Sequence, residues 1–251
     1  MIVTVLGVLV AVGLIGFLVA QRVAHVDTTS LASFTPPPAS SPTPAPTPLP
    51  DLARSDMSRV VTVQAERTNA EELGTGWLFD AHGDFVTNAH VIDGQITVRI
   101  RDRQDRTHPV TVLGVDAALD IALLRSNDGF AGDPLRVDQT RVTHVPLDVI
   151  TIASGKATGQ PELTQETLSQ VDQNVPLASS DIQKGAGQPS VYHHMMELDG
   201  AKIYQGNSGG PVIDSAGAVI GIVTLASKSQ AQGFAIPMSQ VYAELLSYSM
   251  K

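Results

Sequence analysis

Short apolar runs separated by polar turns dominate the chain after residue 55. Ile96, Val98 and Ile100 alternate with polar residues, which is the period of a half-buried β-strand. Many short strands with turn signals and few helical patterns predict an all-β sandwich or barrel. Apolar positions at helical spacing in 239–248 predict one short closing helix. The other apolar runs lie between Gly, Asp and Asn residues at 60–63, 76–79, 110–115, 147–152 and 218–225.

The N-terminal segment has a different pattern. Residues 1–20 contain no charged side chain, and a helix of that length spans about 30 Å, the thickness of a bilayer core. We therefore predict a single-pass membrane anchor over 1–22, with a cleaved signal peptide as the alternative. Arg22 follows the apolar segment, which by itself favours a cytoplasmic location for the rest of the chain. Residues 23–55 are rich in alternating prolines and are predicted to form an extended linker.

Composition narrows the possible functions. The formal net charge of −9 argues against a nucleic-acid partner. The chain has no cysteine, which excludes a disulfide framework and a cysteine nucleophile. The adjacent His193 and His194 suggest a metal site, but nothing else at ligand spacing supports one. We expect neither a metal nor a cofactor.

The segment 206–211 reads GNSGGP and crowds three glycines around Ser208. Glycine costs about 0.5–1 kcal/mol relative to alanine in a regular element, so the density indicates a loop that other residues cannot form. One such loop turns two N–H groups toward a point beside the serine hydroxyl, as an oxyanion hole does around a nucleophile. An ordinary glycine-rich turn is the alternative.

A nucleophilic serine requires a histidine base and a carboxylate that orients it. His90 interrupts the apolar run 85–92, where burying an imidazole without a partner is costly. Asp120 opens the apolar segment 121–124 and is expected to point inward, whereas Asp116 precedes small residues and is the competing carboxylate. The other isolated histidines lie in linker or loop-like contexts and are expected at the surface: His25, His82, His108 and His144.

Five segments, in the family's order, resemble the HtrA-type, trypsin-like serine peptidases: 74–80, 87–92, 116–124, 206–211 and 233–237. The resemblance implies His90 as general base, Asp120 as its orienting carboxylate and Ser208 as nucleophile. It implies that the backbone N–H groups of Gly206 and Ser208 form the oxyanion hole. It also implies a peptidase domain over 56–251, built as a double β-barrel with an N-barrel at about 56–145, a C-barrel at about 146–238 and the triad in the cleft between them.

Two features of the sequence differ from those of related enzymes, namely the residue before the serine and the length of the chain after Pro237. Digestive trypsin-like enzymes have an aspartate before the serine, which pairs with a new N-terminus after activation cleavage. Asn207 cannot form that ion pair, so we expect loop ordering rather than proteolytic activation. About fourteen residues follow Pro237, so we expect no PDZ domain of the kind that anchored HtrA-like proteins carry, and the oligomeric state stays open.

The resemblance to trypsin-like peptidases also implies two groups of residues that would select the substrate. In trypsin-like folds the residue six positions before the serine lies near the base of the primary specificity pocket. The resemblance therefore implies that Lys202 lies there, where it would favour an acidic side chain. A lysine whose flexible stem reaches solvent is the alternative. Val223, Thr224 and Leu225 are expected to form the pocket wall and the edge that pairs with the substrate backbone. Leu225 would then restrict the pocket to small or aliphatic groups.

The predicted function is a membrane-anchored serine endopeptidase that cleaves unfolded or exposed protein segments. The resemblance favours a catalytic domain outside the cytoplasmic membrane of a bacterium, contrary to the orientation that Arg22 suggests. Activity should fall as the pH drops below about 6–7, where an ordinary histidine becomes protonated. The alternative is a peptidase-like fold that binds peptides as a sensor or scaffold without cutting them.

Overall fold

The computed structural model describes the chain from residue 48 onward, except for 68–69, 131, 155–159, 178–187, 201–203, 205 and 228–230. The predicted anchor over 1–22 and most of the predicted linker lie outside the described residues. Within the described ranges, no helix is long and apolar enough to span a bilayer.

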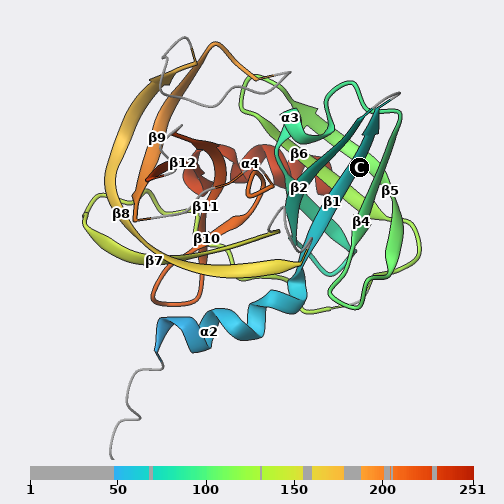
Figure 1. Cartoon of the computed structure of the whole chain (residues 1–251), viewed down its shortest axis with the longest axis horizontal. Coiled ribbons are helices and arrows are strands. Elements are labelled where there is room, and N and C mark those ends of the chain that lie inside the picture. Colours follow the sequence, from blue (N-terminus) through green and yellow to red (C-terminus); the bar gives the residue numbers. More distant parts are fainter. Residues whose placement is uncertain are drawn as a thin grey trace, which may run out of the picture. The chain divides into compact units, whose positions relative to one another are not determined.

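The strands of the described chain form two closed antiparallel barrels, one after the other in sequence (Figure 1). The N-barrel has the strand order β1-β2-β3-β6-β5-β4 and closes where β4 pairs with β1. Its strands are β1 (Val60–Arg67), β2 (Ala70–Leu78), β3 (Asp84–Thr87), β4 (Thr97–Arg101), β5 (Thr107–Asp116) and β6 (Ile121–Ser126).

The C-barrel has the order β10-β11-β12-β9-β8-β7 and closes where β7 pairs with β10. Its strands are β7 (Leu147–Ser154), β8 (Pro161–Pro176), β9 (Val191–Asp199), β10 (Pro211–Ile213), β11 (Val219–Ala226) and β12 (Gln232–Pro237). The two β-barrels and the C-terminal helix agree with the double-barrel fold class predicted from the sequence.

Each barrel has its own apolar cluster, and a further cluster joins the two. Val61, Phe85 and Leu124 belong to the N-barrel cluster, and Leu168 and Val212 to that of the C-barrel. The joining cluster contains residues from both barrels, together with residues from two helices. The strand predicted around Ile96 begins one residue later, at Thr97, and the Ile96 side chain is 72% exposed rather than half-buried.

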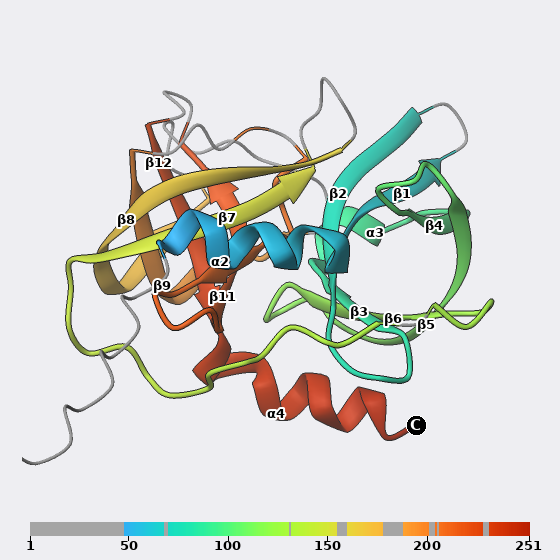
Figure 2. The same ribbon diagram turned by 90° about the horizontal axis from the view of Figure 1, so that it is seen from below.

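The closing helix α4 (Met238–Ser249) matches the predicted 239–248 and contacts β5 and β6 as well as β11 and β12. Val241 and Leu245 are fully buried in the joining cluster. Tyr248 lies directly on Gly114 of β5, where an added Cβ would come within 2.3 Å of the ring. The helix therefore ties the end of the C-barrel to the N-barrel, as Figure 2 shows.

The prediction of a linker over 23–55 is wrong for its last residues, because 49–55 form most of helix α2 (Leu49–Asp56). Pro50 lies in the first turn, where a missing N–H costs no helical hydrogen bond. Ala53 is fully buried in the joining cluster, and α2 lies along β7 and β8 (Figure 2). The short 3₁₀ turn η1 (Met57–Arg59) then leads into β1.

Candidate active site

His90 and Asp120 are hydrogen-bonded to each other in the buried part of the N-barrel. His90 lies in the short helix α3 (Ala89–Ile92), directly after β3, and Asp120 directly precedes β6. The ring Nδ1 of His90 is 2.8 Å from Oδ2 of Asp120 and 3.0 Å from Oδ1. The backbone N–H of His90 also donates to Oδ1, at 2.9 Å. Asp120 is fully buried and His90 is 8% exposed.

This contact determines the tautomer of the neutral ring. An ionised carboxylate only accepts hydrogen bonds, so the proton of the neutral imidazole is on Nδ1 and the lone pair is on Nε2. Asp120 has a positive φ of 55°, a conformation that aspartate tolerates better than most residues. Asp116, the competing carboxylate, instead accepts the backbone N–H groups of Ala118 and Leu119 in the turn.

Two further side chains hold Asp120. The hydroxyl of Tyr192, on β9, donates to Oδ2 of Asp120 at 2.7 Å. Burial, and secondly the charge of Asp120, raise the pKa of Tyr192, so the phenol stays a neutral donor. Asn88 donates from Nδ2 to the backbone carbonyl of Asp120 and to Oγ1 of Thr224, both at 2.8 Å. These contacts connect Asp120 to two strands of the other barrel.

Ser208 lies in a tight loop that contacts both barrels. Its carbonyl accepts the backbone N–H of Thr75 at 2.8 Å. The hydroxyl of Thr75 donates to the carbonyl of Gly206 at 2.7 Å and accepts the N–H of Ser154 at 2.8 Å. In the described structure the Ser208 hydroxyl donates to the backbone carbonyl of Thr224, at 3.3 Å, rather than to the imidazole of His90.

Steric reasons explain why glycine occupies these positions of the loop. Gly206 and Gly209 have φ values of 107° and 91°, which other residues rarely adopt. A Cβ on Gly209 would lie 2.0 Å from the carbonyl oxygen of Thr75. The backbone N–H groups of Gly206 and Ser208 donate to no acceptor within the described part of the chain.

The predicted specificity residues divide into two groups. Lys202 lies outside the described residues. Val223, Thr224 and Leu225 follow one another on β11 and are all buried. Of the three, Thr224 contacts the site most directly, because its hydroxyl meets Asn88 and its carbonyl meets Ser208.

His108 is buried, not at the surface as predicted. Its Nδ1 is 2.8 Å from Oδ2 of Asp128, and its Nε2 is 3.3 Å from Oδ2 of Asp102. The ring also packs edge-on against Phe130. His82 and His144 are exposed, as expected, and His25 lies outside the described residues. His193 and His194 bond separately, to Asn174 and to Asp172.

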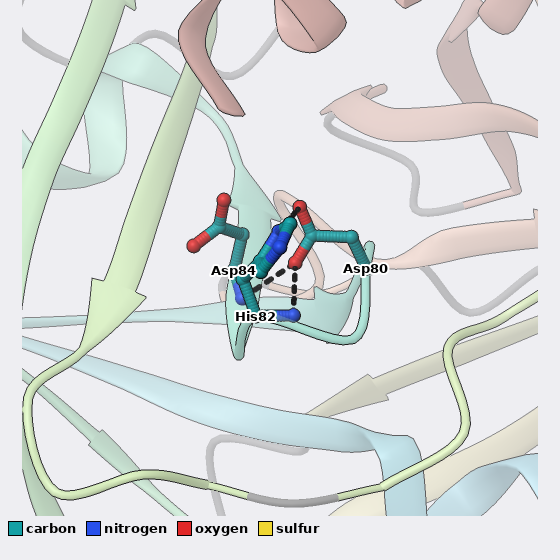
Figure 3. A group of neighbouring side chains, drawn as sticks. All are labelled: Asp80, His82 and Asp84. Atoms are coloured by element: carbon teal, nitrogen blue, oxygen red, sulfur yellow. Dashed lines mark hydrogen bonds and ion pairs between the residues drawn. The ribbon is translucent and has the colours of Figure 1, made fainter. Parts of the chain in front are cut away.

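Asp80, His82 and Asp84 have potential metal-ligating atoms within 4.8 Å of one another (Figure 3). Their oxygens already have partners. Asp80 Oδ1 accepts the backbone N–H groups of His82 and Asp84, and the buried carboxylate of Asp84 forms two hydrogen bonds with Arg125, at 2.7 and 2.8 Å. The group therefore stabilises the turn before β3, and we assign no metal to it.

The sequence model of a protein family, the trypsin-like peptidase domain, matches residues 74–222, which are more than half of the chain. The chain belongs to the trypsin-like peptidase family. The match includes the segments of His90, Asp120 and Ser208, so the geometry above is that of a trypsin-like peptidase domain.

Individual relatives agree with the family. Serine endoprotease DegS of Escherichia coli (strain K12) is 31% identical over 174 residues, which cover 66% of this chain and 45% of DegS. A serine protease HtrA-like protein of Staphylococcus epidermidis is 26% identical over 196 residues, which cover 74% of this chain and 33% of the relative. The resemblance to HtrA-type peptidases is confirmed at this level. The chain spans less than half the length of either relative.

A solved structure shows the same fold. The active form of the Rv3671c protease from M. tuberculosis superposes with a TM-score of 0.65 at 24% identity, covering 86% of this chain and 93% of that one. At this identity the likeness concerns the fold alone.

Proposed function

We propose that this trypsin-like peptidase domain is a serine endopeptidase in which His90, Asp120 and Ser208 act as the triad. The observation that carries the proposal is the buried Asp120 carboxylate, which takes both the Nδ1 and the backbone N–H of His90. This pair leaves Nε2 of the neutral imidazole as a base. His108 also has carboxylate partners, so the buried pair alone would not indicate catalysis. Asp120 is in addition linked through Asn88 and Thr224 to the glycine-rich serine loop.

The reaction has two steps. In the first, Oγ of Ser208 attacks the carbonyl carbon of the scissile peptide bond and gives its proton to Nε2 of His90. The N–H groups of Gly206 and Ser208 bind the oxyanion of the tetrahedral intermediate. The imidazolium then protonates the leaving amine as the C–N bond breaks, leaving an acyl-enzyme. In the second step, water attacks the ester with His90 again as base, which releases the acid and restores the serine.

Before attack, the hydroxyl of Ser208 must leave the carbonyl of Thr224 and turn to the imidazole. This contact favours a second candidate function, a peptide-binding fold that does not cut. The single long bond of 3.3 Å opposes only a side-chain rotation, and rotamer changes are fast compared with typical turnover. We therefore prefer the enzyme, activated when substrate or loop ordering turns the hydroxyl.

We propose that the substrates are unfolded or exposed protein segments outside the cytoplasmic membrane of a bacterium, where the enzyme serves envelope protein quality control. The uncharged, mostly apolar residues 1–20 support a membrane anchor, and the resemblance to HtrA-type peptidases supports the location and substrate class. Buried Leu225 supports a preference for small or aliphatic side chains, and Lys202 for acidic ones.

The test is cleavage of an unfolded protein by the full chain in detergent, followed by mass spectrometry of the fragments. We expect cleavage by the wild type and none by Ser208→Ala or His90→Ala. Binding of the unfolded protein by all three proteins without cleavage would support the peptide-binding alternative. The residues before each cleaved bond report the specificity. Enrichment of basic residues there would contradict the proposed preference.

A further inference from the structure

Tyr192 contacts Asp120 from the C-barrel. The tyrosine lies in β9, 72 positions beyond Asp120, and its side chain is 3% exposed. Its hydroxyl donates to Oδ2, the oxygen that is also nearest to Nδ1 of His90. Among the described residues, His90 and Tyr192 are the titratable side chains in hydrogen-bonding contact with the Asp120 carboxylate. The backbone N–H of His90 also donates to Oδ1, and the neutral Asn88 donates to the backbone carbonyl of Asp120.

We propose that Tyr192 is a positioning residue of the triad, whose hydroxyl orients the Asp120 carboxylate and competes with His90 for one of its oxygens. The proposal rests on the proposed peptidase function. It assigns the residue no contact with substrate. The hydroxyl completes the set of donors around a carboxylate that has no solvent to satisfy it, and so determines how strongly Asp120 attracts the proton on His90.

The physical reason is competition for one oxygen. A hydrogen bond to a carboxylate stabilises its negative charge. It also weakens the other hydrogen bonds that the same oxygen accepts, because the donors share its electron density. With the hydroxyl present, Oδ2 is shared between Tyr192 and His90. Without it, the full charge faces the imidazole, which stabilises the imidazolium and makes the neutral base harder to form. The buried oxygen would also lose a partner, so the carboxylate could move away from Nδ1.

A second contact extends the chain of hydrogen bonds. The side chain of Gln188, which is half-buried and directly follows the segment 178–187, is hydrogen-bonded to the Tyr192 hydroxyl. A donor on the phenol oxygen polarises the O–H bond and strengthens its donation to Asp120. Gln188, Tyr192, Asp120 and His90 are therefore connected in order, and a change at Gln188 should reach the imidazole with a smaller effect than a change at Tyr192.

The decisive variant is Tyr192→Phe, which keeps the ring and removes the hydroxyl. The matched control is Tyr248→Phe, because Tyr248 is also a buried tyrosine of the joining cluster but packs on Gly114 instead of Asp120. For Tyr192→Phe we expect kcat to fall about tenfold with KM unchanged, and the acid limb of the pH profile to move upward by about half a pH unit. The control should keep the wild-type kcat and the wild-type profile.

A measurement independent of activity separates this proposal from the proposed function. The proton on Nδ1 of His90 gives a low-field NMR resonance when it is bound by a carboxylate, and its pH dependence follows the protonation of the ring. In Tyr192→Phe the resonance should move and its midpoint should rise, whereas Tyr248→Phe should match the wild type. This result in a protein that cleaves nothing would retain the positioning role and overturn the peptidase.

An active wild type with an unchanged resonance, kcat and pH profile in Tyr192→Phe would overturn the positioning role alone. If Tyr192→Phe does not fold, Gln188→Leu takes its place, because it leaves the tyrosine ring untouched. It should shift the resonance and the acid limb in the same direction by a smaller amount. No shift in Gln188→Leu would then overturn the proposal.

Discussion

His90 donates twice to the carboxylate of Asp120, once from its ring Nδ1 and once from its backbone N–H. The second bond fixes the position of α3 relative to the carboxylate, so that the ring is oriented by its own backbone as well as by its side chain. An exposed ion pair between the same two groups would contribute little to the stability of the fold. Here the carboxylate is fully buried, so any change in its charge should affect both the imidazole of His90 and the position of α3.

Asp120→Asn tests this arrangement. The amide can donate to Nδ1, which places the proton of the neutral imidazole on Nε2 and removes the base. We expect kcat to fall by about 10³–10⁴-fold. Asp116→Asn is the matched control, since an amide oxygen can still accept the N–H groups of Ala118 and Leu119. Steady-state kinetics on one peptide substrate would measure both, and equal losses in the two variants would contradict the assignment of Asp120.

Thr75→Val should weaken the serine loop. The variant removes the hydroxyl that holds the Gly206 carbonyl and accepts the Ser154 N–H, leaving two buried groups without partners. We expect the free energy of unfolding to fall by about 2–4 kcal/mol, and kcat to fall more than KM changes. Thr111→Val provides the comparison, because Thr111 is exposed and bonds Asn127. Urea denaturation measures the loss of stability in the two variants, and steady-state kinetics measures the change in kcat and KM. A fully active Thr75→Val would show that the loop needs no such support.

Gly209→Ala should be the most damaging small substitution in the loop. The new Cβ would meet the Thr75 carbonyl at 2.0 Å at a φ of 91°, so the loop cannot keep its course. Gly217→Ala shares the positive φ, 74°, but has open space around the new Cβ. We expect Gly217→Ala to cost about 1 kcal/mol and Gly209→Ala to cost more and to abolish activity. Similar stabilities and activities of the two variants would contradict the loop geometry.

Glu166 should make stability depend on pH. Burial raises the pKa of its carboxyl from 4.5 to about 7, and the hydrogen bond from Thr151 opposes only part of this effect. The folded protein therefore holds the proton more tightly than the unfolded chain does. The resulting stability is fully present below pH 4.5 and is lost as the pH rises through about 7.

Glu166→Gln should remove this dependence. We expect the variant to be more stable than the wild type at pH 8, by roughly 1–3 kcal/mol, and about equal to it near pH 4. The exposed Glu162 of the same strand is the control, since Glu162→Gln should leave the difference between the two pH values unchanged. Urea denaturation at both pH values measures the effect. Equal stability of Glu166→Gln and wild type at pH 8 would contradict it.

The site residues that could be predicted from the sequence are those in short segments with a recognisable local pattern. His90 and Ser208 each lie in a short segment with an unusual composition, and Asp120 precedes a clear apolar strand. Tyr192 and Thr75 were missed because their roles depend on partners more than 70 positions away, which no local pattern reports.

The errors have the same origin. His108 lies in a polar stretch, yet the β4–β5 turn and the end of β6 bring Asp102 and Asp128 to its two ring nitrogens. The segment 49–55 follows a proline-rich run, and its few apolar residues suffice for a helix because β7 and β8 cover one face. In both cases, burial is decided by segments distant in sequence.

The most direct test of the proposed triad is covalent labelling of the full chain with a fluorophosphonate probe in the presence of unfolded protein. The probe forms a phosphorus–oxygen bond with an activated serine and releases fluoride, so intact mass and peptide mapping give the extent and the position of labelling. We predict one label on Ser208 in the wild type and none in Ser208→Ala or His90→Ala. An unlabelled wild type, or a label that persists in Ser208→Ala, would contradict the triad.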